Sequence, residues 1–135
     1  MPKRLLIIKA SNDICAAEVV HLRSIAGMFG MDHCVCELTT IKGFKEGLCA
    51  SAEKYDYIYL AAHADVAGFG TSDGSVSISW GEFAGALCET DCLKPECILL
   101  LGCCRGGLKK VAFTLFLGCD RIDYICGPRL TVYGR

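Results

Sequence analysis

The regular alternation of short apolar runs with longer helix-like stretches is the feature that most constrains the fold of this chain. Ile98-Leu99-Leu100-Leu101 is the most apolar run, and such runs are typical of parallel strands buried on both faces. We expect strands over 4–10, 33–38, 55–62, 96–102 and 123–127, and helices over 13–30, 41–53, 80–89 and 108–117. Strands that alternate with helices predict one α/β domain over residues 1–135, a three-layer α/β/α sandwich on a mostly parallel five-stranded sheet.

Local signals support two of these elements. Ser79 precedes the helix 80–89 and Glu82 stands three residues later, which is the pattern of a capping box. In the strand 33–38, the alternation of Cys34, Cys36 and Leu38 predicts one buried and one exposed face.

The charge and the apolar pattern exclude several classes of function. The formal net charge is -1, whereas a nucleic-acid binder needs a basic excess to contact phosphates. No apolar stretch approaches the roughly 18 residues of a membrane span, and no signal peptide is recognisable.

The 11 cysteines are an odd number in a chain with a large apolar core. We therefore expect free thiols and a reducing cytoplasm, with Cys15, Cys49, Cys119 and Cys126 acting as small apolar residues.

Reactive side chains follow two of the predicted strands. His63 comes directly after the strand 55–62, and Cys103 and Cys104 come directly after the strand 96–102. Ligands of parallel α/β sheets bind beyond the carboxyl ends of the strands, so these residues are expected to approach one another there. An imidazole beside a thiol can make the thiol a nucleophile near neutral pH.

These segments resemble a known family. The stretch from Ile98 to Gly106, with Cys104-Arg105-Gly106 at its end, resembles the nucleophile motif of the caspase-like cysteine peptidases, the clan of caspases, metacaspases and CHAT domains. Ile58 to His63 is similar to the strand that ends in the catalytic histidine of that family, and about 40 residues separate His63 from Cys104. Gly70 to Gly74 looks like its Gly-Thr-Asp-Gly turn, and Ile125 to Pro128 is similar to the CHAT domains. The resemblance implies a caspase-like fold with the flavodoxin-like strand order.

The resemblance also implies roles for individual residues. Cys104 matches the nucleophile and His63 the general base, and the backbone N–H groups of Ala64 and Cys104 match the oxyanion hole. Arg105 and Gly106 would support the site. A peptide or protein is the implied substrate, and neither a metal nor an organic cofactor is required.

The resemblance does not extend to the residues that select the substrate side chain in this family. Gly102 stands where caspases carry glutamine and metacaspases aspartate, Ala64 replaces the usual glycine, and no arginine follows the first strand. The chain is also short for the family, so we expect it to lack C-terminal elements of the substrate groove, such as a sixth strand.

Several alternatives remain open from the residues alone. The chain can be a catalytically silent caspase-like interaction or dimerisation module, in which a second copy or a partner subunit pairs with an exposed sheet edge. A zinc site at Cys88, Cys92 and Cys97 is disfavoured by the spacing, and we expect Cys34 and Cys36 to face opposite ways along their strand. A receiver-like or flavodoxin-like binder would need an aspartate after the third strand or a phosphate loop after the first.

Overall fold

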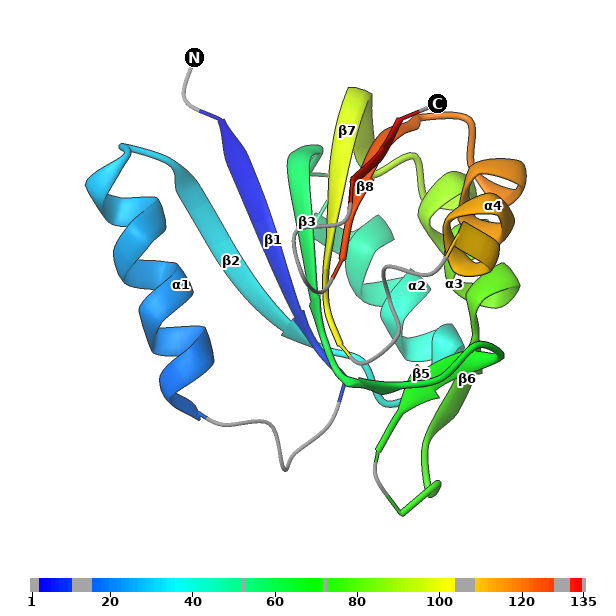
Figure 1. Ribbon diagram of the computed structural model, residues 1–135. Helices are drawn as coiled ribbons and strands as arrows, with labels where there is room; N and C mark the ends of the chain where they lie inside the picture. Colours follow the sequence, from blue (N-terminus) through cyan, green and yellow to red (C-terminus); the bar gives the residue numbers. More distant parts are fainter. Residues whose placement is uncertain are drawn as a thin grey trace.

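A six-stranded sheet lies at the centre of the structure, a computed structural model that describes residues 3–10, 16–51, 53–71, 73–103, 109–127 and 132–134. The strands are β1 (Arg4–Lys9), β2 (Asp32–Glu37), β3 (Tyr55–Ala61), β7 (Leu93–Gly102), β8 (Ile122–Cys126) and β9 (Val132–Gly134). They are hydrogen-bonded in the order β2-β1-β3-β7-β8-β9 (Figure 1). The first five are parallel and β9 is antiparallel to β8. The predicted flavodoxin-like order of five parallel strands is therefore confirmed.

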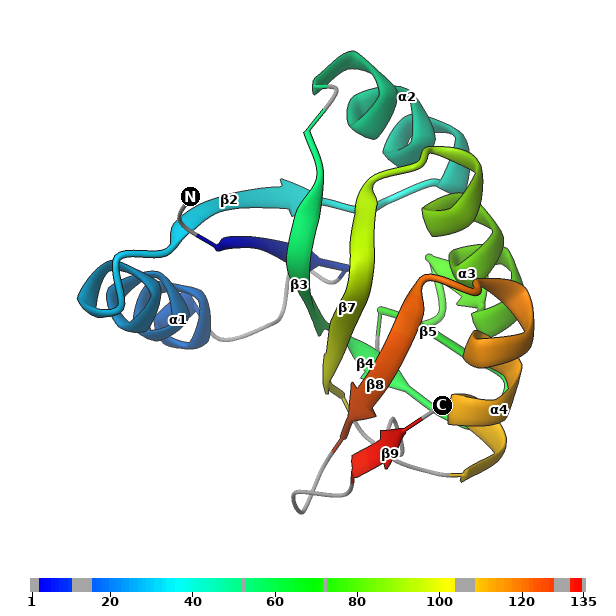
Figure 2. The ribbon, with the colours of Figure 1, turned by 90° about the horizontal axis from the view of Figure 1, so that it is seen from above.

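Helices cover both faces of this sheet. They are α1 (Ala16–Met28), α2 (Ile41–Ser51), α3 (Trp80–Glu89) and α4 (Lys109–Gly118). Figure 2 shows α1 alone on one face, with α2, α3 and α4 together on the other. The predicted three-layer α/β/α sandwich is thus confirmed.

The larger core lies between the sheet and the three helices. Trp80 and Phe83 of α3 are 1% and 0% exposed, and they pack against apolar residues of β3 and β7 such as Leu60 and Leu99. A smaller core lies under α1, where Ala26 meets Leu5 and Ile7 of β1. Each fully buried side chain of this size contributes about 1.5–3 kcal/mol.

The start of α3 agrees with its sequence signal. Ser79 is the N-cap, its hydroxyl accepts a hydrogen bond from the Glu82 N–H (3.1 Å), and the Glu82 carboxylate accepts one from the Ser79 N–H (3.3 Å). The predicted capping box is confirmed.

The sixth strand differs from the sequence-based expectation. β9 was not predicted because three residues are too few for a recognisable pattern, and its pairing depends on β8. Its presence corrects the expectation that the strand pattern ends near residue 127, and it makes β9, together with β2, an edge of the sheet.

α1 exposes apolar side chains as well as burying them. Val20, Met28 and Phe29, which directly follows the helix, are 61%, 82% and 76% exposed. A helix that is apolar on its outer face is usual where another surface covers it. No helix in the described part of the chain is both long and apolar enough to cross a membrane.

Asp56 ties the first residues of three strands together at the amino edge of the sheet. Its carboxylate accepts hydrogen bonds from the Arg4 N–H (2.9 Å) and the Lys94 ammonium (3.2 Å), and Lys3 lies 3.7 Å away. Burial alone would raise the pKa of Asp56, but the bonds from Arg4 and Lys94 and the two lysine charges outweigh burial and lower it.

Asp56→Asn is therefore expected to reduce the free energy of unfolding at pH 7 by about 1–2 kcal/mol, because the lysines lose their carboxylate. A lowered pKa means that the carboxylate stabilises the fold above its unfolded-state pKa, and that this stabilisation is lost as the pH falls through the folded-state pKa. Urea denaturation from pH 7 to pH 2.5 should show the difference between the two proteins shrinking in acid. Glu46→Gln, at an exposed position of α2, is the matched control. A pH-independent difference would contradict this account.

Candidate functional site

The predicted site residues follow, in the sequence, two strands that end at the carboxyl edge of the sheet. β3 and β7 are adjacent and parallel, and their last paired residues are Ala61 and Gly102. His63 stands two residues beyond Ala61, and Cys104 stands two residues beyond Gly102. His63 and Ala64 are described by the structure, whereas Cys104, Arg105 and Gly106 lie outside the described residues.

His63 belongs to a small second sheet that begins where β3 ends. This sheet consists of β4 (His63–Ala64), β5 (Gly68–Gly70) and β6 (Ser77–Ser79), all antiparallel. His63 pairs with Gly70 and is half-buried. β6 leads directly into α3, so the histidine is held between the main sheet and a helix of the larger core.

Asp65 and Trp80 fix the turn after His63. The Asp65 carboxylate accepts hydrogen bonds from the N–H groups of Ala67 (2.8 Å) and Gly68 (3.0 Å). The Trp80 indole N–H donates to the Asp65 carbonyl (3.0 Å), and the Phe69 ring packs on Trp80 with a centroid separation of 5.1 Å. The position of the hairpin is thus coupled to the buried side chain of Trp80.

Glycine is required at two positions of β5. A Cβ atom at Gly68 would overlap the carbonyl of Ile78, and one at Gly70 would overlap the carbonyl of Val76. Both obstacles are backbone atoms of the neighbouring segment, so a side chain would push the strands apart. The Gly-rich composition of 68–75 therefore reflects close strand packing beside His63.

The backbone N–H of Ala64 points away from β5. The Asp65 N–H donates to the Gly68 carbonyl (2.9 Å), which makes these two residues a hydrogen-bonded pair of the ladder. Hydrogen-bonded and non-hydrogen-bonded pairs alternate in antiparallel strands, so Ala64 and Phe69 form a non-hydrogen-bonded pair. The Ala64 N–H is consequently directed outward from the hairpin.

Two hollows open at this edge. One, of about 320 Å³, is lined by His63, Asp65, Thr71 and Ser77 among others. A second, of about 170 Å³, lies at the carboxyl ends of β1 and β2 and shares Thr71 and Val76 with the first. This is the edge at which ligands of parallel α/β sheets bind.

The turn between β5 and β6 separates the two hollows. The Thr71 N–H donates to the Val76 carbonyl (3.1 Å), and the Asp73 carboxylate accepts from the Thr71 hydroxyl (2.8 Å) and the Ser75 N–H (2.9 Å). Gly74 adopts a φ of +77°, which favours glycine. The turn predicted at 70–74 is therefore present at this place, with Ser72 outside the described residues.

Cys103 is a core residue. Its side chain is 6% exposed and belongs to the larger hydrophobic cluster. An incoming substrate therefore has little access to its sulfur.

Tyr59 explains why position 102 is glycine. A Cβ atom at Gly102 would overlap the Tyr59 hydroxyl and ring, and that hydroxyl donates to the Glu18 carboxylate of α1 (2.5 Å). Burial, followed by the bond to Glu18, raises the pKa of Tyr59, so its hydroxyl stays protonated. The space in which a larger residue 102 would lie is occupied by the tyrosine.

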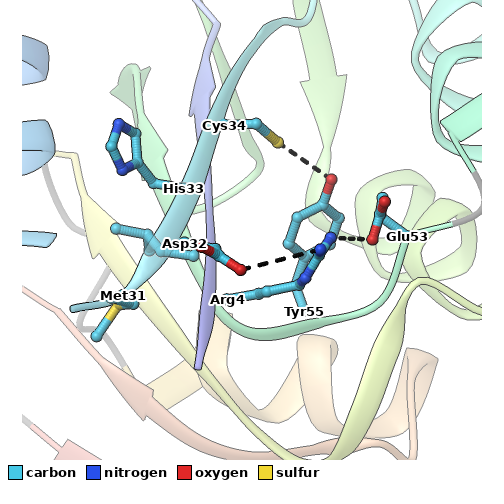
Figure 3. A pocket seen from close by; sticks show the side chains of 8 residues that line it. Arg4, Met31, Asp32, His33, Cys34, Glu53 and Tyr55 are labelled. Atoms are coloured by element: carbon cyan, nitrogen blue, oxygen red, sulfur yellow. Dashed lines mark hydrogen bonds and ion pairs between the residues drawn. The ribbon is translucent and has the colours of Figure 1, made fainter. Parts of the chain in front are cut away.

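A different pocket, of about 520 Å³, lies at the amino edge of the sheet and was not anticipated from the sequence (Figure 3). Arg4 pairs there with Glu53 and, at 4.0 Å, with Asp32. The Cys34 thiol and the buried Tyr55 hydroxyl share a hydrogen bond of 3.1 Å. The acidic and basic side chains of this pocket form ion pairs with one another. Its residues come from separate segments of the chain, so no contiguous motif could have revealed it.

The cysteines lie in more varied environments than predicted. Cys119 is buried as expected, but Cys49 is exposed and Cys126 half-buried, while Cys15 lies outside the described residues. The expectation that Cys34 and Cys36 face opposite ways is wrong, because residues i and i+2 of a strand share a face. Burial, followed by the neighbouring Cys34, raises the pKa of the Cys36 thiol to about 12. In the described part of the chain no three His, Cys, Asp or Glu side chains converge as metal ligands would.

Comparison of the chain with known protein families and with curated proteins found no match.

Gly70→Ala tests whether the close strand packing holds His63 in place. We expect a loss of about 1–3 kcal/mol in unfolding free energy and a change in the environment of His63, because the new methyl group meets the Val76 carbonyl. Chemical denaturation and the imidazole NMR signals would measure the two effects. Gly85→Ala is the control, since no atom lies within 4 Å of its added Cβ and α3 should be stabilised slightly. Unchanged His63 signals in Gly70→Ala would contradict the role given to this packing.

Gly102→Ala tests the contact with Tyr59. Displacement of the tyrosine should break its bond to Glu18 and lower the unfolding free energy by about 1–3 kcal/mol. In a Tyr59→Leu background the same change should have a clearly smaller effect, as a double-mutant cycle of denaturation midpoints would show. Equal effects in both backgrounds would contradict the contact.

Proposed function

We propose that the chain is a cysteine endopeptidase that uses a His63–Cys104 dyad. The observation that carries this proposal is the β3–β7 register, because His63 and Cys104 stand at the same offset beyond the paired residues Ala61 and Gly102. His63 also lines a hollow at the edge where ligands of such sheets bind.

The proposed reaction proceeds through a thioester. His63 takes the proton of the Cys104 thiol, and the thiolate attacks the carbonyl carbon of the scissile peptide bond. The negative oxygen of the tetrahedral intermediate accepts hydrogen bonds from the N–H groups of Ala64 and Cys104. The imidazolium of His63 then protonates the leaving amine, and a water molecule activated by His63 hydrolyses the thioester to regenerate the thiol.

The outward direction of the Ala64 N–H supports its part in this scheme. A donor used in the β4–β5 ladder would not be free to meet a substrate oxygen, whereas the ladder alternation keeps this one outside the hairpin. Arg105 and Gly106 are assigned supporting positions after the nucleophile. The burial of Cys103 favours Cys104 over its neighbour as the nucleophile.

The proposed substrate is a peptide or protein segment with no assigned side-chain preference. Tyr59 fills the space next to Gly102, the position at which the caspases and metacaspases that the chain resembles carry a specificity residue. A reducing compartment such as the cytoplasm suits the reaction, because the nucleophile must remain a free thiol.

A second candidate function, a silent interaction or dimerisation module, is favoured by one observation. Val20, Met28 and Phe29 expose apolar surface at α1, on the face of the sheet that no other described helix covers. The edge strand β2 lies beside α1 and offers unpaired backbone groups to a second copy or a partner subunit.

Cleavage of a mixed peptide library, read by mass spectrometry, separates the two candidates. The wild-type protein should cut peptides. Cys104→Ala removes the proposed nucleophile and His63→Ala removes the proposed base, so each should lower the cleavage rate by at least about 100-fold. Cys103→Ala should retain most of the activity, with the small loss due to a core cavity.

Loss of cleavage in Cys103→Ala with retention in Cys104→Ala would show that the wrong thiol was assigned. Equal cleavage in all four proteins would contradict the dyad. If the folded wild-type protein cuts nothing, both when dilute and when concentrated enough to dimerise, the interaction module becomes the better account.

A further inference from the structure

The carboxyl end of α4 packs closely against the middle of α3. Gly118 at the end of α4 has no side chain, and a Cβ atom there would lie 2.6 Å from the Cβ of Ala84. Ala84 and Cys88 are four residues apart on α3 and so share a face of the helix. Cys119 directly follows Gly118, so the glycine contact brings the two cysteines together.

The two thiols are near enough for Cys88 to influence the pKa of Cys119, and their environments differ. Cys88 is exposed, whereas Cys119 is 1% exposed beneath it. Burial is the largest influence on Cys119 and raises the pKa of its thiol to about 11. Cys119 is therefore protonated at neutral pH, and the accessible sulfur of the pair is that of Cys88.

We propose that Cys88 and Cys119 form a reversible oxidation site that reacts with hydroperoxides and closes a disulfide between α3 and α4. This inference is independent of the peptidase proposal.

The reaction balances with one peroxide for each disulfide. The Cys88 thiolate attacks one oxygen of hydrogen peroxide, the O–O bond breaks, and the departing hydroxide takes a proton to leave as water. The sulfur of Cys119 then attacks the Cys88 sulfenic acid, the S–S bond forms, and the S–O bond breaks. The proton of the Cys119 thiol goes to the departing hydroxide. Two thiols and one peroxide thus yield one disulfide and two waters.

The position of this bond in the chain gives it a wider effect. The residues between Cys88 and Cys119 include β7 and Cys104, so the disulfide would close a covalent loop around the strand at the centre of the sheet. A closed loop restricts the unfolded chain, so the oxidised protein should melt at a higher temperature than the reduced protein.

Peptide mapping tests the site directly, because Cys88 and Cys119 each lie on a peptide that contains no other cysteine. Combined cleavage after Glu, Lys and Arg yields the peptide 83–89 with Cys88 as its sole cysteine, and 111–121 with Cys119 as its sole cysteine. The native protein is treated with one equivalent of hydrogen peroxide, its remaining thiols are blocked with N-ethylmaleimide, and the non-reduced digest is analysed by mass spectrometry. We expect the 83–89 and 111–121 peptides to be linked, and dithiothreitol to separate them.

Three variants and a denatured sample complete the experiment. Cys119→Ala should leave Cys88 as a sulfenic acid that dimedone traps, and Cys88→Ser should abolish both the linked pair and the trapped product. Cys49→Ser, at an exposed thiol of α2, should change nothing. Wild-type protein oxidised in denaturant should give mixed disulfides, because the pairing depends on the fold.

The proposal would be overturned if native wild-type protein gave oxidised or alkylated Cys88 without the linked pair. It would also be overturned if the disulfide formed but lowered the melting temperature, since the two sulfurs would then not be prepositioned. Should Cys119→Ala fail to fold, the wild-type map and the Cys88→Ser map still decide between these outcomes.

Discussion

The parallel pairing of β3 with β7 is the constraint on which the rest of this structure depends. It places two of the most apolar strands at the centre of the sheet, where Leu60 and Leu99 are buried under α3. It also fixes the register at Ala61 and Gly102, the last paired residues before His63 and Cys103 in their two segments. A slip of one residue would turn the buried side chains of β7 to the opposite face, so the core that stabilises the fold also sets the geometry of the site.

The small sheet that carries His63 shows how this geometry extends beyond the strands. His63 is held by pairing with Gly70, and its hairpin is tied to Trp80 through the Asp65 carbonyl. Trp80 is the first residue of α3 and is almost fully buried. These contacts hold the half-buried His63 at one place beside a hollow. A general base that acts on a thiol needs a fixed position of this kind.

Sequence patterns predicted those parts of the molecule that depend on local physics. The α3 helix and its capping box at Ser79 were predicted correctly, since both signals lie within a few residues. β9 was missed because its three residues gain their structure only by pairing with β8. The overlap of Tyr59 with position 102 and the proximity of Cys88 to Cys119 could not have been predicted either, since both join residues that are distant in the sequence. The candidate site was accessible to sequence reasoning only because His63 and Cys104 each follow a strand whose end could be recognised.

The central claim is that His63 activates the thiol of Cys104, and the rate of alkylation at that sulfur tests it without any knowledge of the substrate. Iodoacetamide labelling at pH 7 would compare the wild-type protein with His63→Ala, and fragment-ion mass spectrometry of the peptide 97–105 would assign the label to Cys104 rather than to Cys97 or Cys103. An unassisted thiol is only a few per cent thiolate at this pH. We predict that labelling of Cys104 is at least about 10-fold slower in His63→Ala, while the exposed Cys49 reacts equally in both proteins. Equal labelling of Cys104 in the two folded proteins would contradict the dyad.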